Sequence, residues 1–230
     1  RGSAYPYTRR FAPPIAKPES LLDSVVPPTS LVVDAVFAYR KASKRLLSIP
    51  FESVHEYLDR LRECALALRA AGKRALVYLA AAVSDFYIPY DEMVEHKIQS
   101  STDGLTLRLR PVPKLLGRFK RAAEGHPGEE AWAPEAFLVS FKLETDVAVL
   151  LAKARSAMLT HGVDVVCANL LQSYKAEVRL LLSANSDDFE ERLEHEDAFA
   201  EIEDLLVERL VAMHSDSMRR DACGAAITTS

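Results

Sequence analysis

The fold is decided by one apolar stretch, the sequence ALVYLAAA at residues 75–82. Arg74 precedes the run, and Ser84 and Asp85 follow shortly after it. Continuous apolar runs of this length are typical of strands that are buried on both faces of a parallel sheet. A sheet of that kind needs a layer of helices on each side. The stretch therefore predicts an α/β fold.

The segments around this strand alternate between helix and strand patterns. Upstream, residues 31–42 are predicted to form a helix and residues 45–51 a short strand. Ser53 and Glu56 then form a capping-box pair before a second helix, which ends at Gly72. Downstream, the predicted order is a strand at 136–141, a helix at 145–160 closed by Gly162, a strand at 163–168, an edge strand at 176–182 and an acidic final helix at 187–213. This alternation predicts a Rossmann-like, mostly parallel sheet with helices on both faces.

One insertion interrupts the alternation. Two short extended stretches, residues 97–99 and 105–109, flank a turn at Thr102-Asp103-Gly104 and predict an inserted β-hairpin flap at about residues 96–112. Residues 1–30 contain six of the twelve prolines, which favours a connection over a surface. We therefore expect a proline-rich connecting segment at 1–30, an α/β domain at 31–218 and a flexible tail at 219–230.

The composition excludes several classes of protein. The 230 residues are 49% hydrophobic and 27% charged, which is typical of a globular domain and not of a disordered or collagen-like chain. A net charge of -4 argues against a nucleic-acid partner, and the longest apolar run is too short to span a membrane. Three cysteines, far apart and without a C-x-x-C pair, exclude a disulfide framework and a cysteine zinc site. We expect a cytoplasmic protein.

Three predicted strands end in residues that a hydrophobic core does not require. Asp85 follows the first strand after a run of alanines, Phe141 ends the second, and Asn169 ends the third. Each also has an ordinary structural explanation, because Asp85 can cap a turn, Phe141 can belong to the core and Asn169 can be a turn residue. Open parallel sheets bind ligands beyond the carboxyl ends of their strands. Position alone thus predicts a ligand site at this edge, but it does not name a reaction.

A set of sequence motifs indicates which reaction to expect. They are YLAAAVSDFY at 78–87, EHKIQSS at 95–101, VPKLL at 112–116, SFKLET at 140–145 and VCAN at 166–169. In wording, order and spacing they closely resemble eukaryotic phosphopantothenoylcysteine synthetase, also called phosphopantothenate–cysteine ligase. Members of this family join 4′-phosphopantothenate to L-cysteine in coenzyme A biosynthesis. The resemblance implies that the substrate carboxylate attacks a nucleoside triphosphate, and that the cysteine amine then displaces the nucleotide from the acyl-nucleotidylate.

The resemblance also implies roles for individual residues. Ala81, Ala82 and Asp85 match the phosphopantothenate-binding set, and Lys97 matches the catalytic lysine of a mobile loop. The nucleotide-binding positions that it implies are Phe141, Asn169, Val112, Pro113, Lys114 and Leu115.

Co-substrate and partners follow from the same resemblance. The stretch KIQS at 97–100 stands where bacterial members carry more lysines, which favours ATP over CTP. We expect Mg²⁺ to accompany the triphosphate without protein metal ligands. We also expect a homodimer, with the hairpin flap as a contact.

One family feature has no counterpart in these 230 residues. Members begin with a glycine-rich block that holds the triphosphate, and this block would precede residue 1. We therefore expect a fragment or an incomplete chain of the ligase. The alternative is a non-catalytic remnant of the same fold that binds a nucleotide or a partner. An unrelated nicotinamide-dependent or methyl-transfer domain has little support, because the sequence carries no glycine fingerprint.

Overall fold

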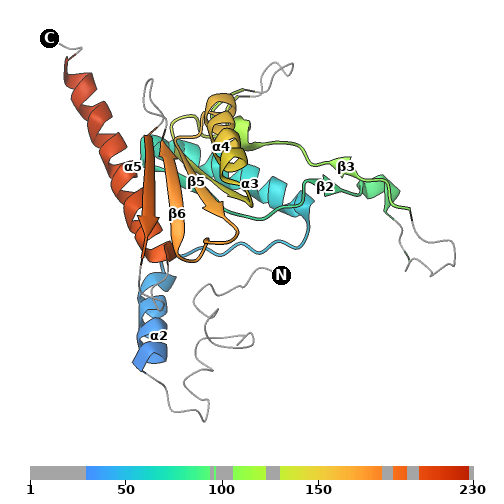
Figure 1. The fold of residues 1–230 in the computed structure, drawn as a ribbon, viewed down its shortest axis with the longest axis horizontal. Coiled ribbons are helices and arrows are strands. Elements are labelled where there is room, and N and C mark those ends of the chain that lie inside the picture. Colours follow the sequence, from blue (N-terminus) through green and yellow to red (C-terminus); the bar gives the residue numbers. More distant parts are fainter. Residues whose placement is uncertain are drawn as a thin grey trace. The chain divides into compact units, whose positions relative to one another are not determined.

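Five strands form the central sheet of the protein in the order β1-β4-β5-β6-β7 (Figure 1). They are β1 (Leu76–Leu79), β4 (Phe137–Glu144), β5 (Val165–Leu170), β6 (Glu177–Leu182) and β7 (Phe189–Glu194). The β1–β4 and β4–β5 pairs are parallel, whereas the β5–β6 and β6–β7 pairs are antiparallel. Four of these strands therefore run in one direction and β6 runs against them, so the predicted mostly parallel sheet is confirmed.

The computed structural model describes residues 30–93, 96, 106–122, 130–182, 189–195 and 202–227. These divide between two units, Arg1–Arg60 and Leu61–Ser230, and the sheet lies in the second. The proline-rich segment at 1–30 lies outside the described residues, apart from residue 30. The predicted domain boundaries stay a prediction.

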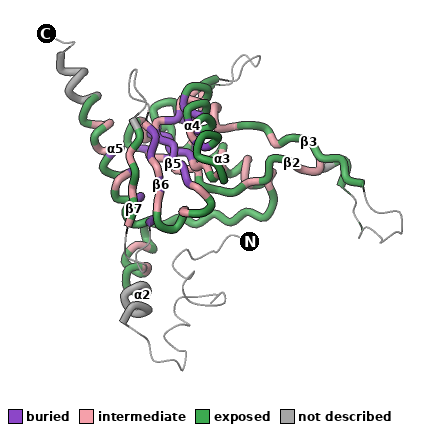
Figure 2. Tube along the Cα trace, in the orientation of Figure 1, coloured by how far each residue is buried: buried purple, intermediate pink, exposed green. Residues whose placement is uncertain are grey.

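Two layers of helices sandwich the sheet (Figure 2). One core cluster packs α4 (Val147–His161), the end of α3 (Val54–Leu68) and the 3-10 helix η4 (Leu116–Phe119) on one face. A second cluster packs α5 (Ile202–Ile227) on the other face. Alternate residues of β4 reach opposite clusters, because Leu138 belongs to the first cluster and Val139 to the second.

The ends of α4 follow the sequence rules for helix caps. The Asp146 side chain accepts a hydrogen bond from the Val149 amide at 2.9 Å, which satisfies one of the free donors of the first turn. At the other end Gly162 adopts a left-handed conformation with φ of 68° and closes the helix. The predicted closure at Gly162 is confirmed.

The prediction of one final helix over the acidic stretch 187–213 is wrong for the first part of that stretch. Residues 189–194 form β7, which pairs with β6, and α5 begins only at Ile202. Charged side chains suit this strand because they have cross-strand partners: Arg179 pairs with Glu190 at 2.9 Å and Arg192 with Glu177 at 3.0 Å. At its far end α5 continues to Ile227, into the segment predicted as a tail.

The first unit contains α2 (Ser30–Ser43) and the beginning of α3. The Glu56 amide donates to the Ser53 hydroxyl at 3.2 Å, which is the predicted capping interaction. The strand predicted at residues 45–51 is wrong, because this stretch forms no strand. Pro50 lacks the N–H group that a paired strand donates.

The insertion between β1 and β4 carries a small antiparallel sheet. Its strands are β2 (Phe86–Tyr87) and β3 (Arg110–Pro111), and η3 (Tyr90–Glu92) follows β2. The predicted presence of an inserted hairpin sheet is therefore confirmed, whereas the strand predicted at 105–109 is wrong in its described part, because residues 106–109 form no strand. Residues 97–105 lie outside the described residues. No described helix is both long and apolar enough to cross a membrane.

Two leucines of α4 provide a matched test of this packing. Leu150 is fully buried in the first cluster, whereas Leu159 on the same helix is 79% exposed. We expect Leu150→Ala to lower the free energy of unfolding by about 3 kcal/mol, because it leaves a cavity, and Leu159→Ala to change it by less than about 0.5 kcal/mol. Urea denaturation measures both, and equal losses would contradict the assignment of the core.

Candidate functional site

The carboxyl edge of the parallel strands brings the predicted site segments together. Leu79, the last residue of β1, pairs in register with Ser140 of β4. Strand β4 continues to Glu144, beyond the end of β1, and Leu143 pairs with Asn169 of β5. The loop that follows β1 therefore lies beside the projecting end of β4, where open α/β sheets bind their ligands.

The loop after β1 carries Ala81, Ala82 and Asp85, and all three are exposed. Its turn is held by Ser84, whose hydroxyl donates to the Phe86 carbonyl at 2.7 Å and accepts from the Phe86 amide at 3.2 Å. Within the described ranges no hydrogen bond uses the Asp85 carboxylate. The Ser84 side chain therefore caps this turn, and the Asp85 side chain does not. The Asp85 carboxylate is thus available to a ligand.

A second predicted segment joins this loop through the backbone. The Val112 amide donates to the Asp85 carbonyl at 2.8 Å, beside the β2–β3 ladder. Val112 and Leu115 are half-buried, whereas Pro113 and Lys114 are exposed. The stretch 112–115, although distant in sequence, therefore lies next to the loop of Asp85.

Phe141 and Asn169 contribute from the strands themselves. Phe141 is half-buried and packs against the cluster beneath α5, in line with a core role for part of its ring. Asn169 lies within β5, so the interpretation as a turn residue is wrong. Its side chain is only 7% exposed, and its Oδ1 has no hydrogen-bond partner among the described residues.

Sequence reasoning missed Ser140, which is 4% exposed and whose hydroxyl also lacks a described partner. Burying a polar atom without a partner costs about 1–3 kcal/mol, which makes each of the two oxygens a candidate for a hydrogen bond to a ligand, Ser140 on the α4 face of the sheet and Asn169 on the α5 face. The signal was available, because Ser140 directly precedes Phe141 in the SFKLET motif. Lys97, the predicted catalytic lysine, lies outside the described residues.

Cys167 lies under this edge, on the face covered by α5. Burial raises the pKa of the Cys167 thiol to about 12, although a hydrogen bond with Tyr78 opposes the shift. Burial, followed by the neighbouring Cys167, raises the pKa of Tyr78 as well. Both groups therefore stay protonated and neutral at physiological pH, and neither is suited to act as a nucleophile.

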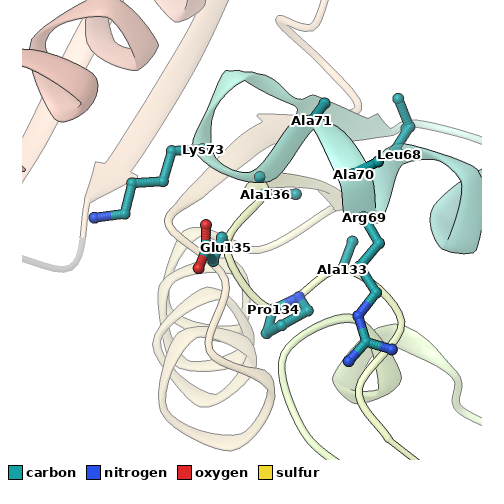
Figure 3. A pocket seen from close by; sticks show the side chains of 10 residues that line it. Leu68, Arg69, Ala70, Ala71, Lys73, Ala133, Pro134, Glu135 and Ala136 are labelled. Carbon is teal, nitrogen blue, oxygen red and sulfur yellow. The ribbon is translucent and has the colours of Figure 1, made fainter.

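A cavity lies where β1 and β4 begin, lined by the residues that Figure 3 shows. It has a volume of about 530 Å³ and lies between the turn η2 (Arg69–Arg74), which leads into β1, and residues 133–136, which lead into β4. Gly72 has a φ of 55°, and a Cβ atom there would lie 2.8 Å from the Glu135 carboxylate. Arg69 is engaged by Glu130. This hollow is separate from the predicted site residues, and the described residues hold no group of three metal-ligating side chains.

The two described cysteines provide a test of the buried edge. Cys64 is exposed and Cys167 is buried. With Cys223 replaced by serine, we expect iodoacetamide at pH 8 to modify Cys64 and to leave Cys167 intact, because the buried thiol does not ionise at that pH. Mass spectrometry locates the adducts. Both cysteines should react in denaturant, and modification of Cys167 in the folded protein would contradict this packing.

Comparison with known proteins gives a consistent result. A family model described as the DNA/pantothenate metabolism flavoprotein C-terminal domain matches residues 53–197. Phosphopantothenate–cysteine ligase 2 of Oryza sativa subsp. japonica is 39% identical, covering 94% of this chain and 65% of the rice protein. Phosphopantothenate–cysteine ligase of Homo sapiens is 37% identical, covering 93% of this chain and 70% of the human protein.

A solved structure is also similar to this chain. The structure of a Cab2 mutant in complex with phosphopantothenate-cysteine matches with a TM-score of 0.73 and 32% identity, covering 94% of this chain and 71% of that chain. This chain spans less than two thirds of the length of the rice relative. The strand order, the edge that gathers the motifs and these similarities lead to one conclusion: the chain belongs to the phosphopantothenate–cysteine ligase family.

Proposed function

We propose that this chain carries out the phosphopantothenate–cysteine ligase reaction of coenzyme A biosynthesis. The observation that carries the proposal is the convergence of three distant segments, residues 80–85, 112–115 and 140–145, with Asn169 at one sheet edge. The similarity to human and rice ligases supports it. The similar Cab2 mutant was solved in complex with phosphopantothenate-cysteine, which is the compound that this edge would form.

In the proposed reaction the nucleophiles belong to the substrates. The carboxylate of 4′-phosphopantothenate attacks the α-phosphate of the nucleoside triphosphate and expels pyrophosphate. The cysteine amine then attacks the acyl carbon, forms the amide, and releases the nucleoside monophosphate and a proton. The protein accelerates both steps by holding the reacting groups in place and by stabilising the developing charge.

The site residues divide between the two substrates. Ala81 and Ala82 have small side chains that let phosphopantothenate approach the backbone, and the Asp85 carboxylate accepts hydrogen bonds from its amide or hydroxyl groups. Phe141 packs against the nucleotide, Asn169 bonds to it, and the stretch 112–115 lines it. Lys97 closes over the phosphates as the catalytic lysine of the flap.

We assign ATP as the co-substrate in preference to CTP, on the eukaryote-like stretch KIQS at 97–100. Mg²⁺ would arrive with the triphosphate, where it neutralises charge on the phosphates. We assign a cytoplasmic location on the three separated cysteines.

A pyrophosphate-release assay tests the function. We expect release that requires phosphopantothenate and Mg²⁺, and a higher kcat/KM with ATP than with CTP. Cysteine should be required for formation of the amide product, which mass spectrometry detects. Binding of ATP without any release would favour the non-catalytic alternative.

Replacement of Asn169 tests its role in nucleotide binding. Asn169→Ala removes an amide that is buried and unpartnered, so we expect kcat/KM for ATP to fall about tenfold or more. Thr160→Ala is the control, because it removes an exposed polar side chain of α4 and should change kcat/KM less than about twofold. Equal effects of the two substitutions would contradict the assignment.

The hairpin flap is our proposed homodimer contact. Deletion of Thr102, Asp103 and Gly104 shortens the predicted turn, and we expect the deletion variant to have the mass of one chain where the parent chain has the mass of two. Light scattering measures both masses. An unchanged dimer would place the contact elsewhere.

A further inference from the structure

His195 lies at the carboxyl end of β7, on the same edge of the sheet as the proposed site. β7 ends at Glu194, and it runs parallel to β5 because both strands are antiparallel to β6. The His195 amide donates to the Ala176 carbonyl at 3.2 Å, which holds the residue against the loop that leads from β5 into β6. Its side chain is half-buried.

One nitrogen of the His195 imidazole is committed to the protein backbone. Nε2 lies 3.0 Å from the carbonyl oxygen of Lys175. A carbonyl oxygen only accepts hydrogen bonds, so Nε2 carries the hydrogen. In the neutral ring the other nitrogen, Nδ1, then has a lone pair and acts as an acceptor. The contact with Lys175 therefore fixes the tautomer of the ring.

The acceptor on Nδ1 has no partner in the part of the chain that the structure describes. The atom is buried, and no described residue forms a hydrogen bond with it. A buried acceptor without a donor costs about 1–3 kcal/mol. A ligand with an N–H or O–H group would remove this cost.

The described charged side chains around His195 do not supply that donor, because they are engaged with other groups. Their partners are as follows: Glu177 pairs with Arg179 at 2.9 Å and with Arg192 at 3.0 Å, Glu194 pairs with Arg192 at 3.1 Å, Arg209 of α5 pairs with Glu191 at 2.7 Å, and the Lys175 ammonium lies 5.9 Å from the ring centre of Tyr174.

His195 shares a face of the sheet with Asn169. Leu193, two residues before His195, packs in the cluster beneath α5, and so does Cys167, two residues before Asn169. Alternate residues of a strand share a face, so both side chains belong to the α5 face. One strand, β6, separates β5 from β7, which places these two strands roughly 10 Å apart. The two acceptors therefore need donors from two different groups.

The proposed reaction releases a proton for which no acceptor has been assigned. The nitrogen of L-cysteine is an ammonium near neutral pH, and it attacks the acyl carbon only after a proton has left. Histidine is the side chain that most often accepts such a proton. When Nδ1 of His195 takes the proton, the Nε2–H group keeps its bond to the Lys175 carbonyl, which stabilises the positive ring.

We propose that Nδ1 of His195 binds the amino group of L-cysteine and accepts its proton. The inference rests on the proposed function, because cysteine is the second nucleophile of that reaction. The ammonium passes one proton to Nδ1, and the resulting amine attacks the acyl carbon. The C–N bond forms, the bond from the acyl carbon to the phosphate oxygen breaks, and the nucleoside monophosphate leaves with the electron pair. The nitrogen loses its second proton to solvent.

His195→Gln tests this role without removing the contact to the backbone. The glutamine amide nitrogen takes the place of Nε2 and can donate to the Lys175 carbonyl, whereas no acceptor remains at the place of Nδ1. We expect kcat/KM for cysteine at pH 7 to fall about a hundredfold or more. His214→Gln is the matched control, because His214 makes the same kind of contact, with the Lys73 carbonyl at 2.7 Å, at the opposite edge of the sheet. Thermal melting of both variants shows that they are folded.

Two further rates separate proton acceptance from a structural role. The defect of His195→Gln should shrink as the pH rises, because cysteine then loses its proton to solvent. Hydroxylamine is unprotonated at neutral pH, so the variant should form the hydroxamate of phosphopantothenate at the rate of the parent chain. An equal loss of rate with cysteine and with hydroxylamine, or an unchanged kcat/KM for cysteine, overturns the proposal.

Nuclear magnetic resonance provides a readout that needs no turnover. The ring-nitrogen signals, assigned with His195→Gln, should show the tautomer with hydrogen on Nε2. In the presence of ATP and phosphopantothenate, without Mg²⁺, L-cysteine should shift the Nδ1 signal, whereas mercaptopropionate, which lacks the amino group, should not. A shift caused by ATP alone would identify a nucleobase amino group as the donor and would overturn the assignment to cysteine.

The two readouts distinguish failure of this inference from failure of the proposed function. An Nδ1 signal that responds to cysteine in a parent chain that releases no pyrophosphate refutes only the ligase function. Pyrophosphate release and amide formation by a parent chain whose Nδ1 signal does not respond to cysteine refute only the role of His195.

Discussion

The register of β4 with its two parallel neighbours is the constraint on which the rest of the structure depends. β4 pairs with β1 through its first four residues and with β5 through its last six. Because the two ladders are offset, the carboxyl end of β4 has β5 on one side only, and the loop after β1 lies on the other. A shift of one residue would move every side chain of β4 to the opposite face. Phe141 would then leave the cluster beneath α5, and Ser140 would leave the face covered by α4.

One ion pair and two hydrogen bonds to the backbone support this register at the amino-terminal ends of the strands. The Asp164 carboxylate accepts from the Leu138 amide at 2.7 Å and pairs with Lys120 at 2.9 Å. Lys120 also donates to the Ala136 carbonyl at 2.6 Å. The partly buried ammonium group therefore has charge and hydrogen bonds satisfied, which is the condition for such a group to be stable inside a protein. The aspartate joins the starts of β4 and β5 directly.

The two edges of the sheet differ in the way their polar groups are satisfied. At the amino-terminal edge, His214 bonds to the Lys73 carbonyl at 2.7 Å, and Asp164 and Lys120 satisfy each other. At the carboxyl edge, the buried oxygens of Ser140 and Asn169 have no partner among the described residues. Unsatisfied polar groups reduce stability, and they persist where binding compensates for them. This difference supports the proposed site at the carboxyl edge, although the described cavity lies at the other.

The sequence by itself determined the alternation of strands and helices, the cap residue Gly162 and the motifs that identify the family, because these depend on local patterns and on the order of residues. It did not determine β7, since cross-strand ion pairs stabilise a charged strand whose partners, Arg179 and Glu177, lie on another strand. Nor did it reveal that the Ser140 oxygen is buried without a partner among the described residues. Only the tertiary structure decided these, because burial and charge proximity depend on residues that are distant in the chain.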